Sequence, residues 1–123
     1  MKRVKLSDLT NEELAQQFAE IAVQQDVALL SRMQTNVNRL FWRLEAIENE
    51  LKSRPSDQRS ALLPLYNHKN KQVQVKAAKA TLAIAPEAAR AQLQTIRESG
   101  WQPQAGEAGM SLWNLDRGIY KPK

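Results

Sequence analysis

The chain has 123 residues, of which 42% are hydrophobic and 25% are charged, and its 18 lysines and arginines outnumber its 13 aspartates and glutamates. Such a chain is long enough to bury the core of one globular domain, and its net charge of +5 is only a weak indication of a nucleic-acid partner. The lack of cysteine and the single histidine exclude disulfides, thiolate nucleophiles and zinc sites built from cysteines or several histidines.

The composition favours helices over strands. Alanine, leucine, glutamine, glutamate, lysine and arginine are abundant and β-branched residues are few, so an all-α fold is expected. The basic N-terminal sequence MKRVKLSDLT is not followed by the apolar region of a signal peptide. No apolar run approaches the roughly 20 residues that span a membrane. We therefore expect a cytoplasmic protein without a membrane partner.

The first helix is predicted from its N-terminal boundary. Thr10 is a favourable N-cap, and Glu13 stands three residues later, as a capping box requires. Leu9 and Leu14 are placed to form a hydrophobic staple around that cap. Apolar residues then recur at helical spacing, which predicts a helix over about residues 11–24.

A longer apolar pattern follows and predicts one helix over about residues 26–53. Its apolar positions are separated by alternating steps of three and four residues, as in a heptad repeat; they are Leu30, Met33, Val37, Leu40, Leu44, Ile47 and Leu51. A helix of that length would extend about 40 Å, more than a small domain needs for its own core. Phe41 and Trp42 lie beside the pattern and are the candidate partner surface, because an exposed apolar strip is typical of an interface.

Two pairs of shorter helices are predicted in the C-terminal half. They cover about residues 57–67 and 71–84, and then 86–99 and 103–117. Asn70 is a good N-cap, Pro86 suits a first helical turn, and Gly100 and Gly118 are helix stops. An offset of 31 residues superposes the two pairs, with Leu62 on Leu93, Leu65 on Ile96, Ala77 on Ala108, Ala78 on Gly109 and Ile84 on Leu115. The segment is therefore a degenerate helical repeat.

The stretch LLPLYNHKNKQVQVKAAKAT resembles a HEAT-type repeat unit, whose second helix usually carries the pattern Val-Arg-x-x-Ala-Ala-x-Ala-Leu. The matching positions are Val73, Ala77, Ala78 and Ala80. Gln74 replaces the arginine and Thr81 replaces the leucine, so the unit is a divergent one.

The stretches IENELKSRP, VKAAKATLAIAPEAAR and PQAGEAGMSLWNLDRG together resemble a small bacterial family, the domain of unknown function number 2019. The resemblance extends from about Leu9 to Gly118. It implies an α-helical, repeat-like fold, and it implies no activity.

These patterns together predict an all-α fold of the α-α superhelix type. A long N-terminal helical hairpin is expected to pack on two degenerate HEAT-like helix pairs within one domain. The predicted parts of that domain, residues 1–123, are a flexible N-terminal arm (1–8), the hairpin (9–55), the two helix pairs (56–118) and a tail (119–123).

Neither the histidine nor the glutamates form a catalytic or metal-binding pattern. His68 lies at a predicted helix–helix turn without a neighbouring nucleophile or carboxylate, so a capping or solvated turn residue is favoured over a general base. Glu45, Glu48 and Glu50 cluster on the second helix, but no Glu-x-x-His motif accompanies them. We expect a salt-bridged glutamate face, no catalytic residue, no metal and no cofactor.

The most suggestive charged group consists of Lys69, Lys71, Lys76 and Lys79. Lys76 and Lys79 share one face of a predicted helix, and the other two lysines lie in the turn that leads into it. Helical-repeat proteins present such faces to phosphates, but no aromatic residues lie between the lysines for base stacking. A nucleic-acid-binding face is therefore the alternative to an ordinary solvated helix face.

The last predicted helix contains Gly106 and Gly109 near Trp101 and Trp113. The glycines do not have the spacing of a phosphate-binding loop. Because each glycine costs a helix about 1 kcal/mol, close helix packing is the expected compensation. The tryptophans are expected to pack in the core or as a lid, with the walls of a ligand pocket as the alternative.

The favoured function is a non-catalytic scaffold that binds another protein of unknown identity, because stacked helical hairpins form an extended surface without catalytic residues. A homodimer through the long second helix is a further prediction. The alternative function is a nucleic-acid-binding module that uses the lysine group.

Overall fold

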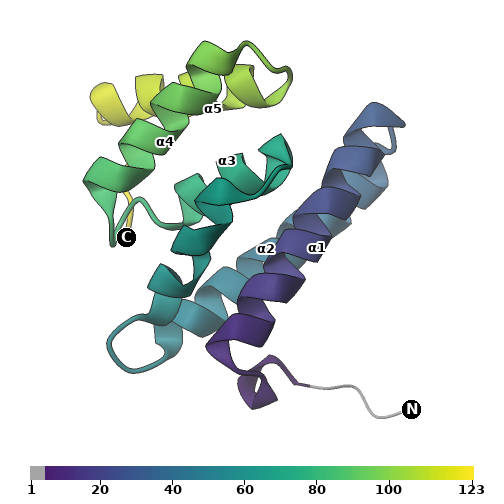
Figure 1. Cartoon of the computed structure of the whole chain (residues 1–123), viewed down its shortest axis with the longest axis vertical. Coiled ribbons are helices and arrows are strands. Elements are labelled where there is room, and N and C mark those ends of the chain that lie inside the picture. The colour runs from purple at the N-terminus through teal and green to yellow at the C-terminus, as the bar shows by residue number, and fades with distance from the viewer. Residues whose placement is uncertain (1–4) are drawn as a thin grey trace. The chain divides into compact units, whose positions relative to one another are not determined.

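The computed structural model describes residues 5–123, and all regular secondary structure in this range is helical (Figure 1). The predicted all-α class is therefore confirmed. The chain divides into two compact units, Met1–Ala61 and Leu62–Lys123, each with its own set of packed helices.

The first unit is a helical hairpin. A short 3₁₀ helix, η1 (Leu6–Asp8), precedes α1 (Asn11–Leu30), which packs antiparallel to α2 (Gln34–Ser53) (Figure 1). The predicted capping box is present: the Thr10 hydroxyl accepts a hydrogen bond from the Glu13 N–H, and the Glu13 carboxylate accepts one from the Thr10 N–H, both at 3.0 Å. The start of α1 is therefore as predicted, although the helix continues past its predicted end.

The prediction of a single helix over residues 26–53 was wrong, because a turn separates α1 from α2. Arg32 adopts a φ of +57°, in the left-handed region. Its N–H donates to the Leu29 carbonyl (3.2 Å), and the Met33 N–H donates to the Ala28 carbonyl (2.9 Å). This is the Schellman arrangement, which ends many helices. The three- and four-residue steps continue across the turn, so periodicity alone could not reveal it.

One side of each hairpin helix is buried. The buried apolar residues are Leu14, Ala15, Phe18, Ala19, Ile21, Ala22 and Ala28 of α1 and Leu40, Leu44, Ile47 and Leu51 of α2. Gln25 is buried as well, and its side-chain amide donates a hydrogen bond to the Val37 carbonyl at 3.2 Å. The burial of one side of α2 leaves the opposite side of that helix exposed.

Arg54, just after α2, is hydrogen-bonded to η1 and to the start of α1. Its guanidinium donates to the carboxylate of Glu50 (3.0 Å), four residues earlier in the chain, and to the side chain of Asn11 (2.8 Å). It also donates to the carbonyls of Leu6 (3.1 Å) and Leu9 (2.7 Å). A single partly buried side chain thus satisfies acceptors from three segments of the first unit.

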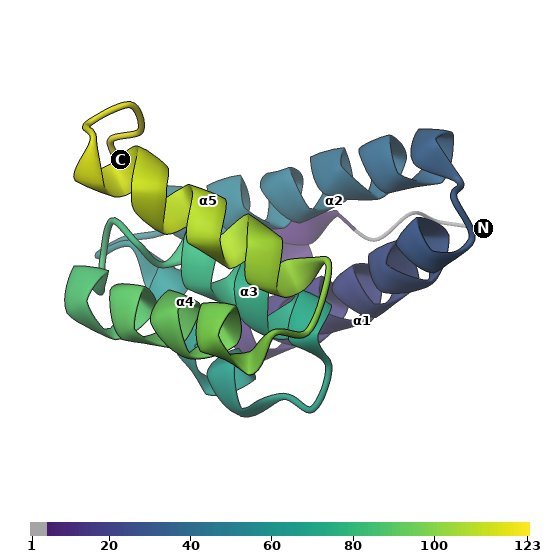
Figure 2. The same cartoon turned by 90° about the horizontal axis from the view of Figure 1, so that it is seen from above.

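The second unit contains α3 (Lys71–Ala80), α4 (Pro86–Ser99) and α5 (Gln104–Asp116), which pack against one another (Figure 2). The Asn70 side chain caps α3 by accepting hydrogen bonds from the N–H groups of Gln72 (2.8 Å) and Val73 (3.2 Å). Gly100 ends α4 with a φ of +68°, a conformation that glycine adopts readily. The cap and the stop both lie at the predicted residues.

The segment predicted as a helix over residues 57–67 forms a 3₁₀ helix, η2 (Gln58–Asn67). Pro64 lies inside it. Proline has no N–H to donate and disfavours the α conformation at the preceding residue, so a regular α-helix is disfavoured here. The first of the two predicted helix pairs therefore consists of a 3₁₀ helix and an α-helix.

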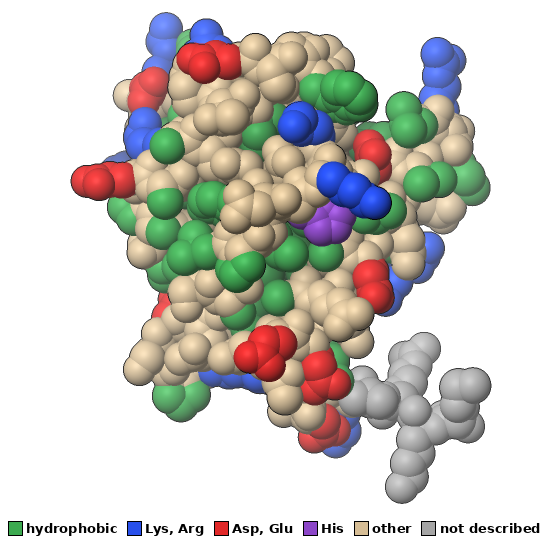
Figure 3. Space-filling model, viewed as in Figure 1, with side chains coloured by type: hydrophobic (Ala, Val, Ile, Leu, Met, Phe, Trp, Pro, Cys, Tyr) green, Lys and Arg blue, Asp and Glu red, His purple; other side chains and the backbone are tan. Residues whose placement is uncertain are grey.

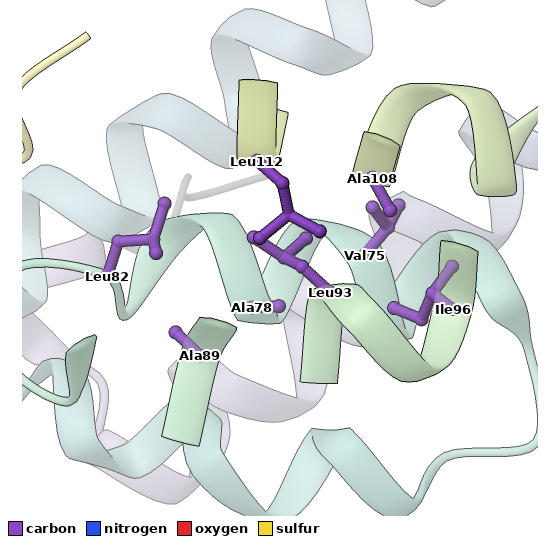
Figure 4. Packing of buried hydrophobic residues seen from close by; sticks show 8 residues of the cluster. All are labelled: Val75, Ala78, Leu82, Ala89, Leu93, Ile96, Ala108 and Leu112. Carbon is purple, nitrogen blue, oxygen red and sulfur yellow. The ribbon is translucent and has the colours of Figure 1, made fainter. Parts of the chain in front are cut away.

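The core of the second unit is built largely from small and branched apolar side chains (Figure 4). The cluster comprises Val75, Ala78, Leu82, Ala89, Leu93, Ile96, Ala108 and Leu112. Alanines at fully buried positions allow α3, α4 and α5 to approach closely, which maximises dispersion contacts. Two of the superposed residue pairs, Leu62 with Leu93 and Ala77 with Ala108, are fully buried.

Candidate functional site

The four lysines grouped in the sequence analysis fall into two pairs in the structure, and only one of these pairs contacts an acidic side chain. Lys76 on α3 forms an ion pair with Glu107 on α5 (Nζ–Oε2 2.8 Å), and Lys79 forms a second one with the same carboxylate oxygen (3.2 Å). Burial by itself would raise the pKa of Glu107, but the charges and hydrogen bonds of the two lysines outweigh it and lower the pKa of this carboxyl. These two lysines therefore hold α3 to α5. Sequence reasoning missed Glu107, although the offset of 31 residues superposes it on Lys76.

The other two lysines lie at the start of α3. Lys69 is exposed in the preceding turn, and Lys71 is the first residue of the helix. In the same turn, Nδ1 of His68 accepts a hydrogen bond from the Asn70 N–H at 3.0 Å, and the His68 carbonyl accepts one from the Gln74 side chain. His68 thus stabilises the turn. On the face shown in Figure 3, the basic side chains form no single continuous area.

The exposed side of α2 carries the two residues predicted as a partner surface. Trp42 is 67% exposed and Phe41 is 41% exposed. Their rings meet edge to face, with centroids 5.2 Å apart. The other exposed residues on the Trp42 side of the helix lie three, four or seven residues from it; they are Thr35, Asn38, Arg39, Ala46 and Asn49. These five residues and Trp42 are called the outer face of α2 below.

Two opposite charges lie symmetrically about Trp42. Arg39 precedes it by three residues and Glu45 follows it by three. Neither side chain forms an ion pair with any residue that the structure describes.

The family model described as Domain of unknown function (DUF2019) matches residues 12–116, which is most of the chain. The chain belongs to the DUF2019 family. The crystal structure of the protein RPA1889 from Rhodopseudomonas palustris CGA009 is similar to this DUF2019 chain, with 49% sequence identity and a TM-score of 0.94 over 98% of this chain and 100% of that one. No curated protein matches the chain. The family resemblance drawn from three sequence stretches is therefore confirmed.

The DUF2019 chain also exposes apolar side chains where its hairpin turns. Leu30 and Met33, which belong to the heptad-like pattern, are exposed, as is Val27. The Schellman turn explains this exposure, because it redirects the chain before the apolar pattern can continue along one helix.

The expected packing of the C-terminal tryptophans and glycines was also wrong. Trp101 is 62% exposed and Trp113 is 47% exposed. The guanidinium of Arg117 lies over the Trp113 ring, 4.4 Å from its centroid. A Cβ atom added to Gly109 would have ordinary contacts, at 3.7 Å or more, with the side chain of Arg97, so this glycine does not mark a close helix crossing.

Two of the three glutamates of α2 have separate partners. Glu50 pairs with Arg54 (3.0 Å), and Glu48 lies 4.0 Å from Arg59. No group of three or more His, Cys, Asp or Glu side chains suited to hold a metal ion exists within residues 5–123. Over that same range, no helix of the DUF2019 chain has the length and apolar character needed to cross a membrane.

Proposed function

We propose that this DUF2019 chain is a non-catalytic protein–protein interaction module whose contact surface is the outer face of α2. The observation that carries the proposal is the exposure of Trp42, two thirds of which remains accessible in the middle of that face. Burial of a large aromatic side chain is favourable. Tryptophan is also strongly enriched at the energetic centres of protein interfaces. A partner that covers Trp42 would therefore gain substantial binding free energy from one residue.

The surroundings of Trp42 suit an extended protein partner. Apart from Trp42, the uncharged residues of the outer face have short side chains; they are Thr35, Asn38, Ala46 and Asn49. From Thr35 to Asn49 the helix makes about four turns. Short side chains on both sides of a large one allow a second helix to lie close along this length.

The helix pairs of the second unit are also consistent with a scaffold that binds another protein. Stacked helix pairs of the HEAT type present surfaces for binding and need no catalytic residues. The Lys76–Glu107 contact (2.8 Å) and the alanine-rich core would keep such a scaffold rigid. Two HEAT-like pairs and a cytoplasmic location are parts of this proposal.

The alternative of nucleic-acid binding has less support, because Lys76 and Lys79 both contact Glu107. A phosphate would compete with that carboxylate for the same two ammonium groups. We expect no binding of duplex DNA or RNA at low ionic strength. Binding that weakens steeply with salt, and that is lost when Lys69 and Lys71 are replaced by glutamate, would favour the alternative.

Site-specific cross-linking in the native host tests the proposed function. A photoreactive phenylalanine derivative is placed at Trp42, and a matched control carries it at Gln16, an exposed residue of α1. We expect one discrete adduct from position 42 and none from position 16. No adduct from position 42, or the same adducts from both positions, would contradict the proposal.

A further inference from the structure

We infer that the partner of the outer face of α2 is an amphipathic helix of another protein, whose apolar side covers Trp42 and whose acidic side chains along one edge pair with Arg39 and Arg43. This inference rests on the proposed function, since it names the chemistry of the partner for the surface proposed above. Its basis is the position of these two arginines, which are both exposed beside Trp42. They are called the arginine edge of α2 below.

The two arginines lie on the same side of Trp42. Successive residues of an α-helix are separated by about 100° around the axis and about 1.5 Å along it. Arg39 and Arg43 therefore lie about 60° and about 100° to one side of Trp42, one helical turn apart. Ala46 lies about 40° to that same side. Its side chain is short, so it leaves the arginine edge accessible to a partner.

The arginine edge is unfavourable for α2 by itself. Side chains four residues apart are neighbours on a helix surface, so the like charges of Arg39 and Arg43 repel each other. Neither guanidinium forms an ion pair with any residue in the range 5–123. Carboxylates of a second molecule would replace this repulsion by attraction. Arginine is suited to them, because its planar guanidinium donates two parallel hydrogen bonds to one carboxylate.

The second unit contains an intramolecular example of such a contact. Lys76 and Lys79 lie three residues apart on α3, and both pair with the carboxylate of Glu107 on α5, at 2.8 and 3.2 Å. The next residue of α5, Ala108, is fully buried in the core beside them. One helix can therefore supply a carboxylate to two cations of another while its neighbouring apolar residue packs between the helices. A partner helix on α2 would repeat this arrangement, with Trp42 as the apolar residue.

The other side of Trp42 favours a protein helix over a nucleic acid. Glu45 lies about 60° to that side, and no ion pair joins it to another described residue. A phosphate backbone across the outer face would approach this carboxylate, which repels it. An amphipathic helix can carry acidic side chains along one edge only, so it matches the arginine edge without meeting Glu45. Apolar anchors in the middle of such a helix are a common mode of protein recognition.

Cross-link mapping combined with charge reversal tests the inference. The photoreactive derivative is placed at position 42 of the full chain in the native host, and mass spectrometry identifies the cross-linked segment. We expect a segment with two or more acidic residues, three or four positions apart, beside apolar ones. The double variant R39E/R43E should lower the yield of this adduct at least tenfold. K69E/K71E, which changes the net charge equally at the start of α3, is the matched control and should leave the yield unchanged.

A synthetic peptide of the cross-linked segment then gives a measured affinity for the full chain. Calorimetry should show at least tenfold weaker binding to the R39E/R43E chain than to wild type. A second peptide, with lysine in place of the acidic residues, should show the opposite preference and bind the R39E/R43E chain at least tenfold more tightly than wild type. This reversal also shows that the double variant folds, so loss of structure cannot imitate the expected result.

The possible outcomes separate the inference from the proposed function. An adduct yield that R39E/R43E leaves unchanged, a cross-linked protein segment without the acidic residues, or a peptide pair without the reversal overturns the inference and leaves the proposed function standing. A cross-linked segment from a second copy of this chain has the same consequence. If position 42 cross-links a nucleic acid instead, or gives no discrete adduct, both the inference and the proposed function fail.

Discussion

Helix α2 of the first unit and helices α3–α5 of the second unit differ in whether their charged side chains form ion pairs within their own unit. In the second unit, Lys76 and Lys79 share the carboxylate of Glu107 at 2.8 and 3.2 Å. On the outer face of α2 and beside it, Arg39 and Glu45 have no such partner among the described residues. Charges that are matched within a unit stabilise that unit, whereas unmatched charges of opposite sign remain available for another molecule.

Trp113 and Trp42 differ in the same way, although Trp101 of the second unit is 62% exposed. The ring of Trp113 in the second unit is covered on one side by the guanidinium of Arg117. The ring of Trp42 meets that of Phe41 edge to face, and Trp42 is the more exposed of the two tryptophans, at 67% against 47%. Trp113 therefore has a covering contact within its own unit, whereas Trp42 is left largely exposed on α2.

The largest expected effect comes from Arg54, which is paired within the first unit. Arg54→Ala removes four hydrogen bonds made by a partly buried guanidinium and should destabilise the first unit by about 2–3 kcal/mol. Hydrogen exchange should show faster exchange in α1 and α2 and little change in α4 and α5. Arg39→Ala is the control and should change stability by less than about 0.5 kcal/mol. Equal loss of protection in both units would contradict the division of the chain into two units.

Glu107→Gln comes next and tests the charge pairing of the second unit. The two lysines lower the pKa of Glu107 in the folded chain, so its ionised form stabilises the fold at pH values above the unfolded pKa of about 4.3. At neutral pH the variant should lose about 1–2 kcal/mol. The difference from wild type should disappear as the pH falls through the lowered folded pKa.

Urea unfolding at several pH values measures this dependence. Asp116→Asn, which removes the exposed ion pair with Arg90, is the control and should lose less than about 1 kcal/mol. A difference between Glu107→Gln and wild type that persists in acid would show that packing, and not charge, accounts for the effect.

A smaller change of opposite sign is expected at Gly109. A Cβ atom there has room beside Arg97, so Gly109→Ala should stabilise α5 by about 0.5–1 kcal/mol through helix propensity. At Gly106 the added Cβ atom would lie 3.1 Å from Oε1 of Gln102, so Gly106→Ala should gain less. Thermal unfolding of the two variants compares them, and a loss of stability at Gly109 would mean that the Arg97 side chain cannot adjust.

The smallest effect is expected at the turn of the first unit. Arg32 holds a left-handed conformation with a φ of +57°, which glycine adopts without strain. Because glycine also makes the unfolded chain more flexible, Arg32→Gly should stabilise the hairpin by only about 0.5 kcal/mol. Chemical denaturation measures this difference. A loss of 1 kcal/mol or more, as expected for glycine inside a helix, would favour one continuous helix over the observed turn.

The parts of the fold that local chemistry determines were predictable from the sequence. The capping box at Thr10, the N-cap at Asn70 and the stop at Gly100 each depend on one or two side chains next to the helix end. The turn at Arg32 was not predictable, because the apolar spacing continues across it and the left-handed residue is arginine instead of the usual glycine. The exposure of Trp101 was missed for a related reason, since burial depends on contacts between distant segments.

The candidate surfaces were predictable only in part. Phe41 and Trp42 were named from their place beside the apolar seam, and both are exposed. The partner of Lys76 and Lys79 was not foreseen, because it lies on a different helix. Charge pairing across helices depends on packing, which a single sequence specifies only indirectly.

Hydroxyl-radical footprinting of Trp42 against Trp101 tests most directly whether the outer face of α2 is an interaction surface. The two side chains are almost equally exposed in the single chain, at 67% and 62%, so each serves as the reference for the other. In dilute solution we expect similar oxidation of both. In intact host cells, Trp42 should be oxidised several-fold less than Trp101, because a partner covers it. Equal oxidation of the two tryptophans under all of these conditions would contradict the account.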